Sequence, residues 1–248
     1  MKRYFYRRNT LANVICQFRY PVLPAIDERI TGFREVLSQD YPQSSQVLEN
    51  MVLYEQETGT PVPKPKIITV NNYQFKTSGQ KYLINLTRDF YALSTSHYTR
   101  WEDFFSQLDS FKGTFEKFYS PEKYIRAGLR YVNVISKKEL GIATETSWSD
   151  LICPSMLGLY TQNKFVQSID NRFSLSFDDQ NEATVRISTP QGRNGWGDTL
   201  VIDSDFFRMS LENVSLVEIL EKLHYHSREF IEHAFQEPLR KVMGKEEM

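Results

Sequence analysis

Two arginines have neighbours of the same kind and could act together on a negatively charged group. Arg19 lies within Phe18–Tyr20, and Arg130 lies within Leu129–Tyr131. Because side chains alternate along a strand, each arginine is expected on the face opposite its two neighbours. A guanidinium group can bind phosphate or carboxylate through two parallel hydrogen bonds. Both arginines are therefore candidate anion ligands, and the alternative is that each forms a structural ion pair within a sheet.

Three further arginines extend this candidate site. Arg172 and Arg186 fall on the polar side of two segments in which apolar and polar residues alternate. Arg193 lies in the glycine-rich segment 192–197, where consecutive backbone amides could hold an anion. That segment matches neither common phosphate-binding glycine motif, so a flexible loop between strands is the alternative. The predicted ligand-binding residues are thus Arg19, Arg130, Arg172, Arg186 and Arg193.

The other residues that could do chemistry carry no recognisable catalytic or metal-binding signature. The sequence has no GxSxG nucleophile elbow and no CxxC pair. His224 and His226 are two residues apart, where helical side chains point in different directions, whereas zinc needs converging ligands. We therefore expect no metal and no other cofactor, and the sequence identifies no catalytic residue.

The composition is that of a folded protein with nearly balanced charge. The chain has 248 residues, of which 40% are hydrophobic and 14% aromatic, so disorder throughout is excluded. Its 30 Lys and Arg against 31 Asp and Glu leave a net charge of −1. Duplex DNA binding without sequence preference depends on a strongly positive surface, so a duplex nucleic acid partner is not expected. The one basic cluster, at residues 2–8, favours an edge strand or a solvated arm.

The cysteines and the hydropathy pattern bear on location. Cys16 lies in an apolar segment and Cys153 precedes Pro154, which is typical of buried thiols in a reducing compartment. The start of the chain lacks the apolar stretch of a signal peptide. No window of about 18 apolar residues occurs either. We expect a cytoplasmic protein that does not enter a membrane.

Two long amphipathic helices are predicted, at residues 101–119 and 215–235. Apolar residues recur in both at helical spacing. Each helix begins with a motif typical of a capping box, Thr99 to Glu102 and Ser215 to Glu218. In the first helix the apolar stripe consists of Phe104, Leu108, Phe111, Phe115 and Phe118.

A pair of short strands is predicted before each long helix. The first pair lies at residues 82–93 with a turn at 87–89, and the second lies at 199–209 with a turn at 203–205. The second pair and its helix follow the first at a constant offset. This recurrence in register predicts an internal duplication.

The rest of the sequence fits two copies of one unit. Opening strands are predicted at residues 14–20 and 127–134, and a helix follows each of them. In the first copy this helix has Ile26, Ile30, Phe33 and Leu37 on one face. We predict an α+β fold of internally duplicated β-α-β-β-β-α units, at residues 1–122 and 123–248. The sheets are expected to be antiparallel with the long helices on one face, as in a saddle or helix-grip pseudo-dimer.

Several segments together resemble a known family. They span nearly the whole chain, and the most specific is residues 128–133; the segments are 16–21, 91–94, 98–101, 128–133 and 234–235. The chain is similar to a sporadically distributed family of uncharacterised bacterial and archaeal proteins of about this length. That family has no established activity, so the resemblance implies no catalytic residues. Its sporadic occurrence implies an accessory protein of a mobile or defence system.

The strand face that carries Arg130 is the surface where we expect a ligand or a partner to bind. Val132 and Val134 lie on the same side of their strand, so this face is partly apolar. We predict a non-catalytic binding module whose open sheet face or groove takes an anionic ligand or a protein partner. One alternative is an enzyme of unrecognised type that acts on an anionic substrate in the same groove. The other is a homodimer that uses the sheet face or a sheet edge.

Overall fold

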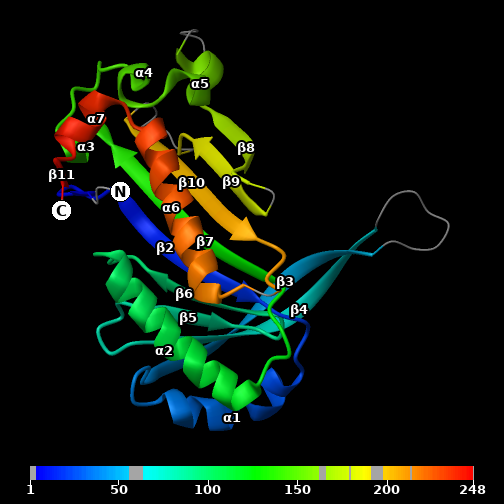
Figure 1. Cartoon of the computed structure of the whole chain (residues 1–248). Coiled ribbons are helices and arrows are strands. Elements are labelled where there is room, and N and C mark those ends of the chain that lie inside the picture. The colour runs from blue at the N-terminus through cyan, green and yellow to red at the C-terminus, as the bar shows by residue number, and fades with distance from the viewer. Residues whose placement is uncertain are drawn as a thin grey trace. The chain divides into compact units, whose positions relative to one another are not determined.

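The chain divides into two compact units (Figure 1). The central unit consists of residues 16–126, and the terminal unit consists of residues 1–15 and 127–248. The predicted boundary after residue 122 lies close to the observed boundary between residues 126 and 127. Residues 1–15, in contrast, group with the C-terminal half of the chain. The structure is a computed structural model, and it describes residues 4–55, 64–161, 166–178, 180–190, 198–212 and 214–247.

The central unit contains an antiparallel meander and two helices. The strand order is β3-β4-β5-β6, and all three pairings are antiparallel. The predicted turn at residues 87–89 joins β5 to β6. In chain order the elements are the end of β2 (Leu11–Arg19), α1 (Ala25–Leu37), β3 (Gln43–Glu55), β4 (Lys64–Lys76), β5 (Leu83–Leu86), β6 (Phe90–Thr95) and α2 (Trp101–Tyr119).

Aromatic side chains fill the core between these helices and their sheet. The Phe33 ring of α1 lies 6.0 Å from Phe75 of β4 and 6.1 Å from Phe111 of α2, measured between centroids. Tyr91 of β6 lies 4.8 Å from Phe115 of α2. Both helices therefore cover the same face of the sheet. The buried residues of α1 are those that the sequence predicts: Ile26, Ile30, Phe33 and Leu37.

The terminal unit contains four antiparallel strands, in the order β7-β10-β9-β8. The first and last described strands, β1 and β11, pair with each other. Tyr4–Tyr6 of the N-terminal cluster form β1, and Arg7 and Arg8 follow it outside the strand. The elements are β1 (Tyr4–Tyr6), β7 (Arg126–Ser136), α3 (Lys137–Leu140), α4 (Trp148–Leu151), α5 (Pro154–Leu157), η1 (Gly158–Thr161), β8 (Asp170–Ser176), β9 (Asn181–Ser188), β10 (Thr199–Arg208), α6 (Leu216–Ala234), α7 (Glu237–Val242) and β11 (Lys245–Glu247).

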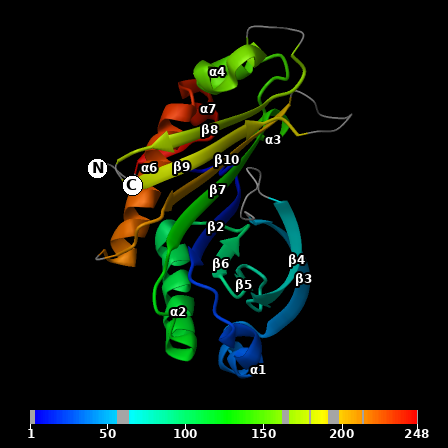
Figure 2. The ribbon, with the colours of Figure 1, turned by 90° about the vertical axis from the view of Figure 1, so that its right-hand side faces the viewer.

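Helix α6 covers one face of the terminal sheet, and Figure 2 shows the opposite face of β7, β10, β9 and β8 turned to the viewer. Phe230 of α6 lies 6.1 Å from Phe206 of β10, and His226 stacks on Phe177 at 4.7 Å. The prediction of an α+β fold with antiparallel sheets is confirmed, since each unit combines such a sheet with helices.

The predicted turn at residues 203–205 is wrong, because β10 is one continuous strand. Asp203 and Asp205 pair with β7 on one side and with β9 on the other. Ser204 between them is fully buried, and its hydroxyl donates to the carbonyl of Tyr131 at 3.3 Å. Pairing on both sides overrides the local turn preference of Asp and Ser.

The duplication therefore stays a prediction. Both units run from a strand through helix to an antiparallel meander and a long helix, but the meander of the central unit has one strand more. The strand pair that the sequence suggests for the second copy does not exist.

Both predicted capping boxes are wrong as well. The N-cap of α2 is Arg100, and neither it nor Ser215 at the start of α6 makes a side-chain capping bond. Thr99 instead donates to the Asp103 carboxylate at 3.1 Å, and Arg100 forms an ion pair with the same residue at 2.9 Å.

None of the helices in the described part of the chain combines the length and the hydropathy that a transmembrane span needs.

Candidate functional site

Three of the five predicted ligand arginines lie on one face of the terminal sheet, opposite α6. Along each strand the residues that face α6 are more buried, and their neighbours on the other face are more exposed. We call this second face the arginine face. Its described residues include Arg130, Val132 and Val134 of β7, Val201, Asp203 and Asp205 of β10, Thr184 and Arg186 of β9, and Asp170, Arg172 and Ser174 of β8.

Strand register brings opposite charges together on the arginine face. Asp203 lies opposite Arg186 on β9, and Arg186 lies opposite Arg172 on β8. On the other side of β10, Asp205 lies opposite Arg130. Cross-strand neighbours of opposite charge stabilise a sheet pair, as at Asp203–Arg186 and Asp205–Arg130. Arg186 and Arg172 are like charges, and the bond from Arg186 to Asp170 offsets their repulsion.

Two of the arginines form bidentate ion pairs. Arg130 donates to Asp203 through Nε at 2.7 Å and through Nη2 at 2.5 Å. Arg186 donates to Asp170 in the same way, with both distances 2.6 Å. The hydrogen bonds that Arg130 donates to Asp203 raise the pKa of Arg130, and the bond donated by Arg186 lowers the pKa of the Asp170 carboxyl. The guanidinium groups of Arg130 and Arg186 are therefore occupied by aspartates, as the structural alternative requires.

Arg172 differs from these two arginines. It is exposed, and it makes no hydrogen bond or ion pair with another described residue. Its charge nevertheless helps to lower the pKa of Asp170, after the larger effect of Arg186. The Asp170 carboxylate is thus bonded by Arg186 and only influenced electrostatically by Arg172. Strand β8, which carries Asp170 and Arg172, is the last strand in the order of its sheet.

Arg19 lies in the central unit. Its Nη2 lies 3.1 Å from the Asp89 carboxylate, and its guanidinium carbon lies 5.9 Å from the centroid of the Phe90 ring. The Nε atom is buried without a hydrogen-bond partner among the described residues. A shared site of Arg19 and Arg130 stays a prediction. Arg193 and the segment 192–197 lie outside the described residues.

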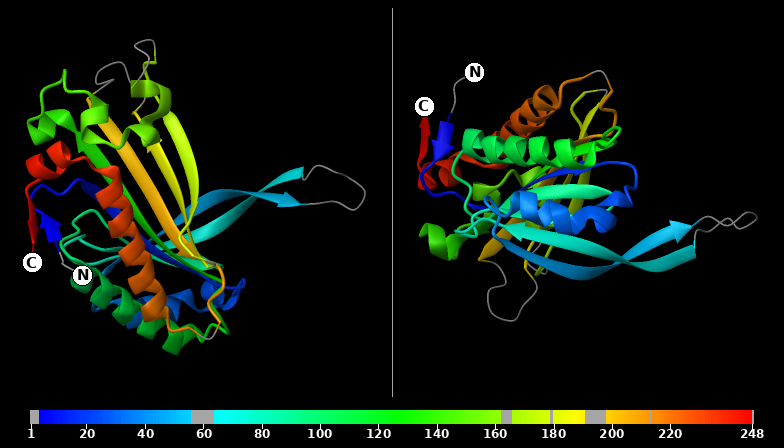
Figure 3. Two further views of the ribbon diagram at one scale, coloured as in Figure 1. Left: turned by 45° about the horizontal axis from the view of Figure 1, so that its top comes forward. Right: turned by 90° about the horizontal axis from the view of Figure 1, so that it is seen from below.

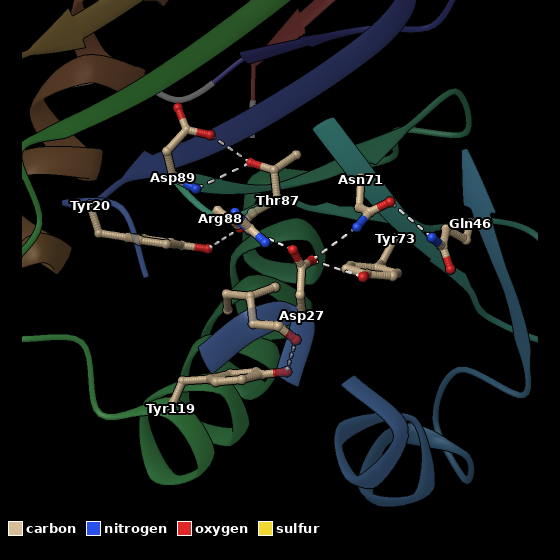
Figure 4. A network of polar contacts seen from close by, with 10 residues as sticks. Tyr20, Asp27, Gln46, Asn71, Tyr73, Thr87, Arg88, Asp89 and Tyr119 are labelled. Atoms are coloured by element: carbon tan, nitrogen blue, oxygen red, sulfur yellow. Dashed lines mark hydrogen bonds and ion pairs between the residues drawn. The ribbon is translucent and has the colours of Figure 1, made fainter. Parts of the chain in front are cut away.

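Asp89 connects Arg19 to a polar network around the turn between β5 and β6 (Figure 4). The Thr87 hydroxyl donates to Asp89 at 2.8 Å, and the Tyr20 hydroxyl donates to the carbonyl of Thr87 at 2.9 Å. Arg88, in the same turn, pairs with Asp27 in the first turn of α1. These contacts fix the turn against the start of α1.

Asp27 is the most connected carboxylate in this network, and the sequence analysis missed it. It accepts from the Tyr73 hydroxyl at 2.8 Å and from the Asn71 side chain at 3.3 Å, besides its pair with Arg88. Burial raises the pKa of Tyr73 to about 12, and the bond to Asp27 adds to this. All of these donors come from its own unit, so the network is structural. An acidic residue in a first helical turn was the only signal in the sequence.

Lys137 is a second buried charge that the sequence did not single out. Only 4% of it is exposed, and its Nζ donates to the carbonyls of Thr144 at 2.9 Å and Thr146 at 2.7 Å. It also lies 4.8 Å from the centroid of the Trp148 ring. Burial lowers its pKa. Its contacts hold the loop after α3, which is a structural role.

Within the described ranges, no group of three or more His, Cys, Asp or Glu side chains is arranged to bind a metal ion. Cys16 is buried as expected, whereas Cys153 is partly exposed. His224 contacts the Tyr131 hydroxyl at 2.8 Å, which places it among core contacts.

Neither protein-family models nor curated proteins show a match to this sequence.

Proposed function

We propose that this chain is a non-catalytic binding protein whose arginine face takes a carboxylate-bearing segment of a protein partner. The observation that carries the proposal is Arg172, an exposed guanidinium group of β8 that lies opposite Arg186, whose own guanidinium group is bound by Asp170. A carboxylate from a partner can bind Arg172 bidentately without displacing a partner that Arg172 already has.

The charge pattern of the face favours a protein segment over a small polyanion. Arg130 and Arg186 are already bound by aspartates, and Asp205 adds a further negative charge beside Arg130. A phosphate-rich ligand would meet all of these carboxylates, whereas a single side-chain carboxylate at Arg172 would meet Asp170, whose charge Arg186 already balances. Complementary charges of this kind set the orientation of a partner and suppress wrong ones.

The position of Arg172 adds a second source of recognition. Since β8 is the last strand in its sheet, its outer main-chain groups can bond an extended segment. Arg172 and Ser174 are both exposed on this strand, and they would supply side-chain contacts. We infer an acidic, extended segment lying along β8. A free anion such as phosphate could also bind the Arg172 guanidinium group. No specific observation favours the alternative that the chain is an enzyme.

The test uses a synthetic hexaglutamate peptide and inorganic phosphate as probes, with amide chemical shifts of the labelled chain as the readout. We expect the peptide to shift β8 and β9 signals, and Arg172→Glu to abolish the shifts. Lys222→Glu is the matched control, because it makes the same charge change on the exposed side of α6 in the same unit. Arg172→Lys keeps the charge but removes the planar fork, and it should bind more weakly.

Each outcome bears on the proposal. Equal losses in Arg172→Glu and Lys222→Glu would mean unspecific attraction, and unchanged shifts in Arg172→Glu would place binding elsewhere. Phosphate that binds at Arg172 as well as the peptide does would favour the small-anion source. A cytoplasmic location and a role in a mobile or defence system remain predictions, and the latter depends on the family resemblance.

A further inference from the structure

Strands β3 and β4 of the central unit form a ribbon that extends beyond their own sheet. They pair without interruption from Gln43–Lys76 to Glu55–Lys64. Strand β5 pairs only with Tyr73–Lys76 of β4. From Asn72 outward, the two strands therefore have no third strand beside them in the described sheet, and Figure 3 shows the ribbon leaving the helices of its unit.

This ribbon exposes apolar side chains to solvent. The exposed fraction is 68% for Leu48 and 69% for Ile67, and it is 41% for Val47. Polar cross-strand bonds hold the ribbon instead of a core: Gln46 donates to Asn71 at 2.9 Å, and Thr69 donates to Asn50 at 2.9 Å. A two-stranded ribbon is marginally stable in water by itself, so this one gains from an additional strand.

The outer edge of β3 lacks the features that usually protect an edge strand. Lysine, proline and bulges are the common protective features. Strand β4 has Lys64, Pro65 and Lys66 near its outer end, whereas Gln43–Glu55 contains no lysine, arginine or proline. The continuous register with β4 also excludes a bulge in β3. Strand β3 therefore presents a long, regular row of main-chain donors and acceptors.

We propose that the β3 edge is the site at which a second copy of this chain binds, by antiparallel pairing of β3 with β3 around a two-fold axis near Leu48. This inference rests on the central unit alone and is independent of the proposed binding at Arg172.

The charge of the strand favours a second copy as the occupant. Its described side chains up to Asn50 are amides, hydroxyls and aliphatic groups, with Glu49 as the one charge. The Glu49 carboxylate already accepts from Asn72 at 2.6 Å. A strongly acidic or basic partner would find no complementary charges here, whereas the same neutral strand of a second copy matches it in length and chemistry.

A two-fold axis at Leu48 gives favourable cross-strand neighbours. Leu48 then lies opposite Leu48 of the second copy, and Gln46 lies opposite Asn50. Val47 lies opposite Glu49, so no two carboxylates face each other, a situation that would destabilise the pairing. The exposed Leu48 side chains would be shielded from water by each other.

Cysteine cross-linking tests the pairing and its register. In a Cys153→Ser background, single cysteines replace each residue from Ser45 to Asn50, and Ile67→Cys serves as the control of equal exposure on β4. Opposite residues in an antiparallel pair lie about 4.5–5.5 Å apart between Cα atoms, within the range that a disulfide spans. We expect oxidation to give a covalent dimer that peaks at Leu48→Cys and falls on either side. Cross-linking no stronger than that of Ile67→Cys at all six positions would overturn the proposal.

Sedimentation of the uncross-linked chain provides the second measurement. Leu48→Lys introduces the protection that the edge lacks, and it should raise the dimer dissociation constant at least about tenfold. Ile67→Lys makes the same change at a residue of matching exposure off the β3 edge and should leave the constant unchanged. A monomeric wild-type chain at high micromolar concentration, or equal effects of the two lysines, would contradict the inference. Arg172→Glu should not affect this association.

Discussion

Arg130 binds Asp203 diagonally across β7 and β10, although the residue directly opposite it is Asp205. Both guanidinium–carboxylate distances, 2.7 and 2.5 Å, fit a bidentate pair. Asp203 and Asp205 both lie on the exposed face of a strand that is paired on each side. The arginine thus offsets the repulsion between two aspartates that a strand places on one face.

We expect Arg130→Ala to lower the free energy of unfolding by about 1 kcal/mol. Bonds between charged groups contribute about 1.5–3 kcal/mol, and solvent screening reduces this value here because 46% of the Arg130 side chain is exposed. Urea unfolding of Arg130→Ala, Asp203→Ala and the double variant measures the coupling. A coupling energy near zero would show that the pair contributes nothing to stability, and a loss above about 3 kcal/mol would indicate a pair that behaves as buried.

Arg172→Ala should leave the free energy of unfolding within about 0.5 kcal/mol of the wild type, since the side chain is exposed and has no bond to lose. Thermal and urea unfolding check this expectation. A loss comparable with that of Arg130→Ala would make Arg172 a structural residue and remove the main support for the proposed binding site.

Asp27→Ala should destabilise the central unit by about 2 kcal/mol, because it leaves the buried Tyr73 hydroxyl without its acceptor. Asp27→Asn keeps an acceptor oxygen and should cost less. The background Tyr73→Phe separates the causes, since removal of the donor should reduce the effect of Asp27→Ala. An undiminished effect in that background would assign the loss to Arg88 and Asn71 instead.

The acid stability of the chain should depend on Asp178 in the turn between β8 and β9. Burial opposes ionisation there, but bonds from the Asn181 side chain and from the amides of Gln180 and Asn181 lower the pKa of Asp178 to about 2. Because this value lies below that of the unfolded chain, the stabilisation is present above about pH 4 and is lost as the pH falls towards 2.

Asp178→Asn should therefore flatten the decline of stability in this acid range. Unfolding measured at a series of pH values tests the expectation, and an NMR titration of the Asp178 carboxyl checks the pKa directly. Identical acid declines in the wild type and Asp178→Asn would contradict it.

The helices could be predicted from the sequence because their pattern is local. The bounds of α2 at Trp101–Tyr119 and the buried face of α1 both follow from apolar residues spaced three or four apart. The alternation of β8 and β9 was equally visible, since one side of each strand packs on a hydrophobic core. Such patterns need only neighbours within two turns or within one strand.

Only the tertiary structure decided what the charged residues do. Arg130 and Asp203 are 73 positions apart, and Asp27 meets Tyr73 over 46 positions. No local pattern shows that Asp203–Asp205 continues a strand, because the pairing that overrides its turn preference comes from β7 and β9. The sequence alone identified the arginines as residues able to bind an anion. Strand register decides which of these arginines forms an ion pair with an aspartate. It also decides that Arg172 forms no such pair among the described residues. Register is set by long-range pairing in the folded chain.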